Sequence, residues 1–454
     1  MTPLIRRAGA LLLLGLVAAV ASAQPARDPA PAVAPPAATA SAAAPAAPPS
    51  ADAQQAYRTS RDKLVQVRTL RRKTNTQSST GSGFVVSADG LIVTNFHVAA
   101  DLALEPERHR GVVVSMEGQE TEVVLLAFDV QHDLAVLRPL KPAGAAAALP
   151  LRPADQPMSR GERIYALGNP LDVGFAVTEG IYNGLVARSF YPRIFFGGAL
   201  NSGMSGGPAL DAGGRVVGVN VAKRVDADLV SFLVPVEFAA KLIARARSAQ
   251  PITQPAFAEL TRQLTAHQAL LVERYVTAAP RHERYGGFRV PVPDEALARC
   301  WGDGRGRESN SLFDFERSDC TLDSGVYSGR GALGNLSVRY EAYDGRRLHP
   351  LQFAQIYGKS FKNEPFRTRG GRDQTAVECR ESFVGNQGLT QRAVLCLSAY
   401  RKLPGLYDVS LLTATVQQPQ AGVLSRLNAS GLTFENAQRL IAHHLKGFAW
   451  EGRP

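Results

Sequence analysis

Long apolar runs and cysteines are scarce in this chain of 454 residues, and their scarcity excludes several kinds of site. Only the first 23 residues hold a long apolar run, so the sequence offers no second candidate for a membrane-spanning helix. Cysteine is absent until residue 300, and no C-x-x-C pair occurs. We therefore expect no zinc or other metal site, and no cofactor.

The first 23 residues, MTPLIRRAGALLLLGLVAAVASA, are typical of a cleaved secretory signal. Arg6 and Arg7 precede the apolar core, and Ala21-Ser22-Ala23 forms a small-residue cleavage site. The core is short of the roughly 20 residues that a spanning helix needs. We predict a mature chain that starts near Gln24 and is periplasmic or secreted.

Alanine and proline dominate residues 24–54, which hold hardly any large apolar side chain. Such a segment cannot bury enough surface to offset the entropy of the chain, and we predict a disordered linker. About 400 residues remain, enough for two or three domains of ordinary length.

The four cysteines are all in the second half of the chain: Cys300, Cys320, Cys379 and Cys396. An even number in an exported chain favours disulfides over free thiols, although three pairings are possible. The pairing of sequence neighbours, Cys300 with Cys320 and Cys379 with Cys396, closes the shortest loops and is the one we predict.

Basic residues outnumber acidic residues by 51 to 40, which gives a formal net charge of +11. The densest cluster is RTLRRK at residues 68–73. Nucleic acid is not an expected partner of an exported protein. Weak contact with anionic cell-envelope surfaces is one interpretation of the charge, and a solvated edge of the first strand is the simpler one.

Short β-branched runs separated by turn residues fill residues 63–235, among them EVVLLAF and RVVGVNV. This pattern is typical of an all-β sandwich or barrel. Helical periodicity is nearly absent there and returns at residues 236–247 and 255–275. We predict one β domain at residues 55–249 and a helical connector at residues 250–279.

Residues 280–454 are expected to form a C-terminal α+β domain, whose role the sequence does not reveal. Its β-branched runs continue to about residue 430, and a helix is predicted over residues 433–448. His443 and His444 lie on or beside the apolar face of that helix. We interpret both as core or surface histidines, because no cluster of acidic residues accompanies them.

Three residues far apart in the sequence together offer the chemistry of acyl transfer. Ser205 lies in the glycine-rich stretch GALNSGMSGGPALD, His97 ends the run LIVTNFHV, and Asp133 opens the run DLAVL. A serine nucleophile needs an imidazole base, and the imidazole needs a carboxylate that fixes its tautomer. The backbone N–H groups of Gly203 and Ser205 are the candidate oxyanion hole. Asp129 is the rival carboxylate.

Four motifs in this order resemble the trypsin-like serine proteases, and within them the bacterial HtrA/Deg-type branch. The motifs are GSGFVVSADGLIVTNFHV, HDLAVLR, ALGNPLDVGFAVTEGIYNGL and GALNSGMSGGPALDAGGRVVGVN. The resemblance covers roughly residues 60–245 and implies a double six-stranded β-barrel with the three residues in the cleft between the barrels. The expected fold is mainly β, with a helical connector and a β-rich, disulfide-containing C-terminal domain that ends in a helix.

The sequence departs from the family pattern at three points. Met204 stands where the family usually has Asn or Asp, and Gly197 aligns with the Asp of the frequent run DAAINPGNSGG. No PDZ domain is recognisable after the protease-like residues. These departures support an alternative, an inactive protease-like scaffold whose C-terminal domain recognises a partner.

The resemblance implies a serine endopeptidase that acts on polypeptides, with a substrate pocket that holds no charge. Family members that select Lys or Arg have an aspartate six residues before the serine, and this chain has Ala199 there. The other expected pocket residues are Leu200, Val219, Asn220 and Val221. A cation in such a pocket would lose its hydration without gaining a partner. We expect cleavage after small or medium aliphatic residues of unfolded proteins, and by analogy a role in protein quality control.

Overall fold

The computed structural model describes residues 50–141, 147–223, 229–278, 281–305, 313–361 and 373–452. The predicted signal peptide and residues 24–49 of the predicted linker lie outside these ranges. Within them, no helix combines the length and the apolar character that crossing a membrane requires.

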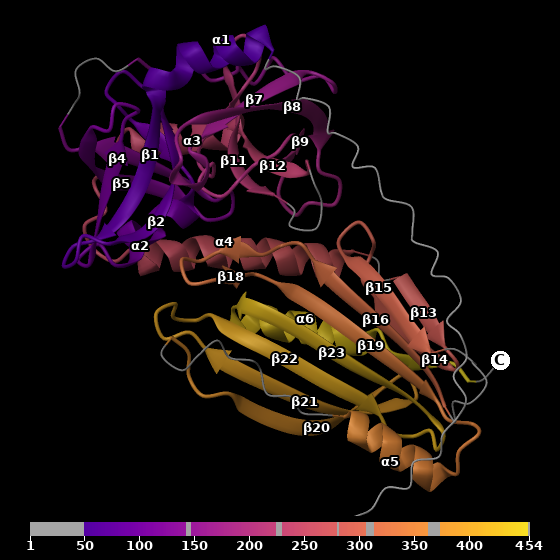
Figure 1. Ribbon diagram of the computed structural model, residues 1–454. Helices are drawn as coiled ribbons and strands as arrows, with labels where there is room; N and C mark the ends of the chain where they lie inside the picture. Colours follow the sequence, from indigo (N-terminus) through magenta and orange to yellow (C-terminus); the bar gives the residue numbers. More distant parts are fainter. Residues whose placement is uncertain are drawn as a thin grey trace, which may run out of the picture. The chain divides into compact units, whose positions relative to one another are not determined.

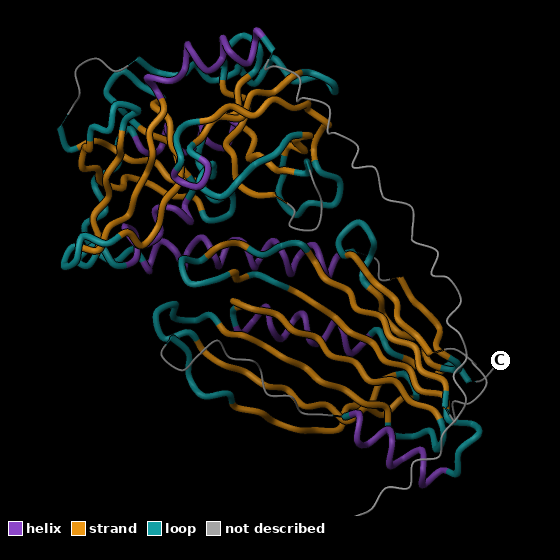
Figure 2. Tube along the Cα trace, viewed as in Figure 1, coloured by secondary structure: helices purple, strands orange, loops and turns teal. Residues whose placement is uncertain are grey.

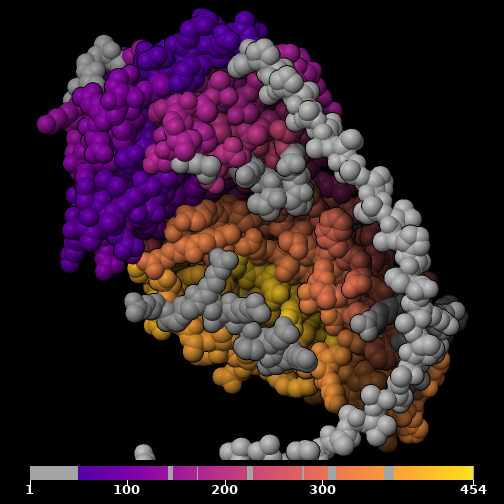
Figure 3. All heavy atoms as spheres, in the orientation of Figure 1, coloured from indigo at the N-terminus to yellow at the C-terminus, as the bar shows by residue number. Residues whose placement is uncertain are grey.

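The end of the predicted linker is helical, which corrects its boundary. Helix α1 (Ala51–Ser60) follows Ser50, whose side chain accepts a hydrogen bond from the N–H of Ala53 at 3.0 Å. Ala53 and Ala56 are buried in a core to which both barrels contribute. A serine cap and an alanine face therefore order residues 51–54, which their composition alone did not indicate. The first described residues, whose atoms are indigo, form part of the surface seen in Figure 3.

The first barrel confirms the predicted six strands. It closes in the order β1-β2-β3-β6-β5-β4, and its interior holds β-branched side chains such as Val67, Ile92 and Val113. The strands are β1 (Leu64–Arg71), β2 (Gln77–Val85), β3 (Ile92–Thr94), β4 (His109–Val114), β5 (Glu120–Asp129) and β6 (Leu134–Pro139), and the short helix η1 (Arg61–Lys63) precedes them.

The second barrel also has six strands, in the order β10-β11-β12-β9-β8-β7. They are β7 (Arg163–Gly168), β8 (Ala176–Leu185), β9 (Ile194–Gly197), β10 (Pro208–Leu210), β11 (Val216–Lys223) and β12 (Ser231–Pro235), with a short helix η2 (Pro170–Asp172) before β8. Helix α3 (Val236–Ala246) follows, as predicted, and buries Ala239, Leu242 and Ile243 in the core shared by the barrels. The strands of both barrels are orange in Figure 2.

One helix inside the first barrel domain was not expected. Helix α2 (Phe96–Leu104) follows β3 directly, so His97 lies in a first helical turn rather than at the end of a strand. Seven of its nine residues are buried, among them Phe96, Leu102 and Leu104. A helix that is apolar on nearly every side has no amphipathic periodicity, and its sequence reads as the continuation of a buried strand.

Helix α4 (Phe257–Thr277) is the predicted connector, and it belongs to two cores. Leu260 and Leu264 are buried with residues of the first barrel. Leu271, Val272 and Tyr275, farther along the same helix, are buried with residues of the C-terminal sheet. The connector is therefore a packed element of both domains.

The residues just before α4 are attached to the first barrel by backbone hydrogen bonds. The N–H of Ile252 donates to the carbonyl of Leu125, and the N–H of Ala256 donates to the carbonyl of Ala103, both at 2.8 Å. The residues that follow the predicted boundary near residue 250 are therefore hydrogen-bonded to the first barrel domain.

The C-terminal domain is built on a seven-stranded antiparallel sheet in the order β15-β16-β19-β23-β22-β21-β20 (Figure 1). Its strands are β15 (Arg299–Arg305), β16 (Asp314–Leu322), β19 (Leu336–Asp344), β20 (Glu378–Asn386), β21 (Leu389–Ala399), β22 (Tyr407–Thr415) and β23 (Ala421–Leu432). Smaller elements are the sheet of β13 (Arg281–Tyr285), β14 (Phe288–Val292) and β24 (Ala449–Trp450), the hairpin of β17 (Val326–Tyr327) and β18 (Ala332–Leu333), and helix α5 (Pro350–Ser360).

The terminal helix α6 (Phe434–Lys446) confirms the predicted helix at the end of the chain. Ala437 and Leu440 are buried in the core of the sheet. His444 is also buried, and its Nε2 lies 2.8 Å from the hydroxyl of Ser425. Burial lowers the pKa of His444 to about 3, so this histidine is a neutral core residue.

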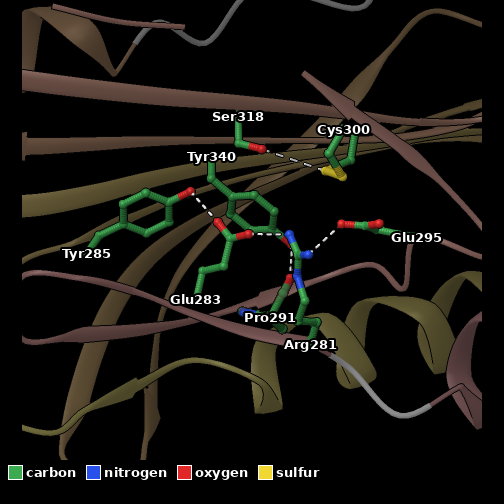
Figure 4. The surroundings of a disulfide bond; sticks show 9 residues. Arg281, Glu283, Tyr285, Pro291, Glu295, Cys300, Ser318 and Tyr340 are labelled. Atoms are coloured by element: carbon green, nitrogen blue, oxygen red, sulfur yellow. Dashed lines mark hydrogen bonds and ion pairs between the residues drawn. A yellow bond between two sulfur atoms is a disulfide. The ribbon is translucent and has the colours of Figure 1, made fainter. Parts of the chain in front are cut away.

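Two disulfides fasten the outermost strands of the sheet. Cys300 of β15 is bonded to Cys320 of β16, and Cys379 of β20 is bonded to Cys396 of β21, in the predicted pairing. β15 and β20 are the two edge strands, and the first six residues of β20 are exposed. Burial therefore contributes little to the stability of β20. Figure 4 shows the surroundings of the Cys300 bond, where the hydroxyl of Ser318 lies 3.8 Å from the sulfur of Cys320.

Candidate active site

The junction between β3 and α2 positions His97. The backbone N–H of Phe96 donates to the carbonyl of Asp133 at 3.1 Å, and the side-chain amide of Asn95 donates to the same carbonyl at 2.8 Å. Asn95 is fully buried at the N-terminus of the helix. The start of α2 is therefore tied to the start of β6, which brings His97 and Asp133 together from residues 36 apart in sequence.

His97 and Asp133 form a close pair. Nδ1 of His97 lies 2.6 Å from Oδ2 of Asp133, and the backbone N–H of His97 donates to Oδ1 at 2.8 Å. Burial alone would lower the pKa of His97, but the charge of Asp133 and its hydrogen bond outweigh burial and raise that pKa above 6.5. The contact through Nδ1 leaves Nε2 as the ring nitrogen available to a reacting group.

Asp129 belongs to a different pair. Its Oδ2 lies 2.7 Å from Nδ1 of His132, and its Oδ1 accepts the backbone N–H groups of Gln131 and His132 at 3.0 and 3.2 Å. Burial raises the pKa of Asp129, but the contacts with His132 and Gln131 outweigh burial and lower it. These contacts close the turn that leads to Asp133, whose backbone has the unusual φ of +56°.

A serine of the first barrel holds the loop that carries Ser205. The hydroxyl of Ser82 donates to the carbonyl of Gly203 at 2.7 Å, and its backbone N–H donates to the carbonyl of Ser205 at 2.8 Å. Its hydroxyl also accepts the N–H of Asn169 at 2.9 Å. Ser82 in β2 therefore bridges the two barrels at the candidate site, and it is buried.

The glycines beside Ser205 are required by the space and by the backbone. Gly206 has φ of +87°, and a Cβ there would lie 2.3 Å from the carbonyl oxygen of Ser82 and 2.9 Å from the backbone nitrogen of Asn95. Any larger residue would push the loop away from the segment that carries His97. Gly203 has φ of +94°, which favours glycine as well.

The hydroxyl of Ser205 donates to the carbonyl of Val221 at 3.4 Å, a long contact. Within the described residues it makes no hydrogen bond with His97. The backbone N–H groups of Gly203 and Ser205 likewise have no acceptor among the described residues. The arrangement thus contains a carboxylate–imidazole pair, two backbone donors without an acceptor among the described residues, and a serine hydroxyl on a loop that packs against Asn95. In unliganded proteases the contact between serine and histidine is often loose and tightens when substrate binds.

Residues 81–219 match the family described as the trypsin-like peptidase domain. A probable periplasmic serine endoprotease DegP-like of Brucella suis is 36% identical over 146 residues, which cover 31% of this chain and 27% of that protein. The mitochondrial serine protease HTRA2 of Bos taurus is 38% identical over 170 residues, which cover 35% of this chain and 34% of that protein. Residues 81–219 are therefore a trypsin-like peptidase domain, and they are similar to the protease domains of HtrA-type proteins.

The similarity is confined to part of each molecule, because the chain spans about a third or less of the length of these two relatives. The solved serine endoprotease from Yersinia pestis is 26% identical, with a TM-score of 0.38, over 44% of this chain and 68% of its own.

Met204 of this trypsin-like domain points into the second barrel. Its side chain is buried in one cluster with Ile164, Phe196 and Leu200. Met204, which stands where the family usually has Asn or Asp, is therefore part of this core.

The expected pocket residues differ in their exposure. Ala199 and Val221 are partly exposed, whereas Leu200, Val219 and Asn220 are buried. The amide of Asn220 donates to the carbonyls of Leu167 and Met204 at 2.9 and 3.3 Å. Asn220 therefore supports the Ser205 loop through its hydrogen bond to the carbonyl of Met204.

Three residues around the site were not identified from the sequence, namely Ser82, Asn95 and Asn220 as a supporting residue. Each acts through a backbone carbonyl of a distant segment, and such a role leaves no spacing or periodicity to detect. Among the described residues, no group of three or more His, Cys, Asp or Glu side chains could hold a metal ion.

Proposed function

We propose that this protein is an exported serine endopeptidase with Ser205 as nucleophile, His97 as general base and acid, and Asp133 as orienting carboxylate. The observation that carries the proposal is the 2.6 Å contact between His97 Nδ1 and Asp133, which leaves Nε2 free to accept the proton of a serine hydroxyl. The HtrA-type relatives support the same reading.

The residues would act in the following order. Ser205 Oγ attacks the carbonyl carbon of the scissile peptide and passes its proton to His97 Nε2. The negative oxygen of the tetrahedral intermediate accepts hydrogen bonds from the N–H groups of Gly203 and Ser205. His97 returns the proton to the leaving amine as the C–N bond breaks. A water molecule then hydrolyses the acyl-enzyme by the same route.

Ala199 and its sequence neighbours Gly198 and Leu200 carry no charge, which supports cleavage after small or medium aliphatic residues. Such residues are buried in folded proteins, so unfolded polypeptides are the proposed substrates. Digestion of a peptide library by the purified protein tests this proposal, and a profile dominated by cleavage after Lys or Arg would contradict it. Equal rates on folded and on reduced, unfolded substrates would remove the proposed role in quality control.

Export to the periplasm is part of the proposal. It is supported by the signal-like first 23 residues, by the two disulfides and by the similarity to a probable periplasmic endoprotease of Brucella suis. The N-terminal sequence of the protein recovered from a periplasmic extract tests it, with a start near Gln24 expected.

An inactive scaffold is the second candidate, and the hydrogen bond of Ser205 to Val221 favours it. A fluorophosphonate probe distinguishes the two candidates, because the probe reacts only with a serine that its histidine activates. We expect labelling that Ser205→Ala abolishes and that Ser202→Ala, an exposed serine of the same loop, leaves intact. Folded protein that is not labelled would favour the scaffold.

A further inference from the structure

The hairpin of β17 and β18, a part of the C-terminal domain, packs on the helix that carries His97. Val326 and Leu333 of the hairpin are buried in one cluster with Phe96, Leu102 and Leu104 of α2. The core of the first barrel is therefore completed by residues more than 200 positions later in the sequence.

The tip of the hairpin fits closely against the end of α2. Gly329 has φ of +86°, and a Cβ there would lie 2.2 Å from Leu104 Cδ1. The guanidinium of Arg330 pairs with Glu105, which follows α2, and with Asp373 of the C-terminal domain at 2.7 Å. The steric fit thus fixes the hairpin at this place, and the ion pairs of the half-exposed Arg330 side chain add little to it.

Tyr327 is the residue of the hairpin that reaches the candidate site. The centroid of its ring lies 6.2 Å from that of His97, with the ring planes at 83°, and 6.3 Å from that of Phe96 at 64°. Both are edge-to-face arrangements, which aromatic rings prefer. The hydroxyl of Tyr327 donates to the carbonyl of Gly329 at 3.0 Å, within the hairpin itself.

Tyr327 is partly buried beside the charged pair that His97 forms with Asp133. Burial raises the pKa of Tyr327, and the negative charges of Asp101 and Asp133 raise it further. The ring is in edge contact with His97, and the charge of Asp133 acts on its hydroxyl. Excluding water from a charged hydrogen bond strengthens it, and an edge contact restricts the rotation of the imidazole.

We propose that Tyr327 is a positioning residue for His97, so that the C-terminal domain completes the catalytic unit. The inference rests on the proposed function, because it gives Tyr327 a role in an activity that His97 carries. The ring is the part that acts, since among the described residues the hydroxyl bonds only to Gly329 of the hairpin itself. Losing the ring lets the imidazole leave the orientation in which Nε2 meets Ser205, and misplacement of a catalytic group can lower a rate by about 100-fold.

The test compares the full-length protein with Tyr327→Phe, Tyr327→Ala, Tyr327→Leu and Arg330→Gln. Phe keeps the ring, Leu keeps apolar volume without a ring, and Arg330→Gln alters the same hairpin away from His97. One readout is the rate of labelling by a fluorophosphonate probe, separated into its maximal rate and its half-saturating concentration. The other is the downfield proton NMR signal of His97 Nδ1–H, which reports the bond to Asp133 without requiring activity.

We expect Tyr327→Ala and Tyr327→Leu to lower the maximal rate at least about tenfold and to shift or broaden the NMR signal, with the half-saturating concentration little changed. Tyr327→Phe and Arg330→Gln should stay within about twofold of the wild type. If Tyr327→Ala does not fold, Tyr327→Leu decides. The inference is wrong if the ringless variants label like an active wild type, or if Arg330→Gln slows labelling as much as they do. A wild type that is not labelled refutes the proposed function, and the NMR signal then still tests the contact.

Discussion

The carboxylate of Asp133 contacts His97 twice, through the imidazole Nδ1 at 2.6 Å and through the backbone N–H at 2.8 Å. One contact holds the ring and the other holds the backbone that carries it, so a single carboxylate acts on both parts of His97. We predict that Asp133→Asn, His97→Ala and Ser205→Ala each lower peptide hydrolysis at least about a thousandfold, because the three residues act as a unit. Kinetic assays with thermal melting measure this, and the barrels should remain folded.

Asp129→Asn is the matched control for the carboxylate. Asp129 binds His132 and the turn before Asp133. Its loss should therefore lower the melting temperature clearly and the rate of peptide hydrolysis only a little. The assignment of the orienting carboxylate is refuted if Asp129→Asn abolishes hydrolysis and Asp133→Asn does not.

The pH dependence of labelling should follow the neutral form of His97. Asp133 raises the pKa of His97, so activity should rise with pH through a value above 6.5. Asp133→Asn removes that effect and should move the midpoint to lower pH. Labelling rates between about pH 5 and pH 9 measure both midpoints.

The raised pKa of His97 should make stability fall with rising pH, whereas activity rises. The pKa of His97 is higher in the folded than in the unfolded chain, so its contribution to stability is complete below about pH 6.5 and is lost as pH rises through the folded value. Melting temperatures of the wild type and of His97→Ala should therefore converge as pH rises. A labelling rate of the wild type whose midpoint lies below pH 6.5 would contradict the pairing of His97 with Asp133.

The disulfides should matter chiefly for the C-terminal domain. They close loops of 20 and 17 residues, and each should stabilise that domain by about 3 kcal/mol. Replacing Cys379 and Cys396 by serine releases the exposed edge strand β20, and we expect the melting temperature of the C-terminal domain to fall. Thiol labelling of the denatured, unreduced wild type should find no reactive thiol, and four reactive thiols would contradict the pairing.

Much of the protease domain could be predicted because its signals are local. The β-branched runs follow the strands, and the motifs around His97, Asp133 and Ser205 lie in the segments that the fold brings together. Helix α2 was missed because a helix buried on nearly all sides has no polar face. Ser82 was missed because it acts on backbone carbonyls, which every residue has.

The contribution of the C-terminal domain could not be predicted from the sequence. Val326, Leu333 and Leu406 look like ordinary core residues of their own domain. Nothing in their spacing indicates that they are buried with the first barrel, because packing between segments far apart in sequence depends on the folded shape.

A chain truncated at residue 250, the boundary which the sequence suggests, lacks part of the core of the first barrel. The C-terminal part supplies six buried residues to the core of the first barrel: Leu260, Leu264, Val326, Leu333, Leu403 and Leu406. Burying one such side chain stabilises by about 1.5–3 kcal/mol, so their joint loss approaches the roughly 5–15 kcal/mol that holds a whole domain folded.

Truncation also removes the hydrogen bonds of Ile252 and Ala256 to the first barrel. We therefore expect the fragment of residues 50–250 to aggregate, or to bind a hydrophobic dye without a cooperative melt. A fragment of residues 50–279 restores Leu260 and Leu264 through α4 and should recover part of the solubility, although not the contact of Tyr327 with His97. Soluble yield and calorimetry compare the two fragments with the full-length chain. A monomeric 50–250 fragment that melts cooperatively and labels at the full-length rate would show that the barrels are complete without the C-terminal domain.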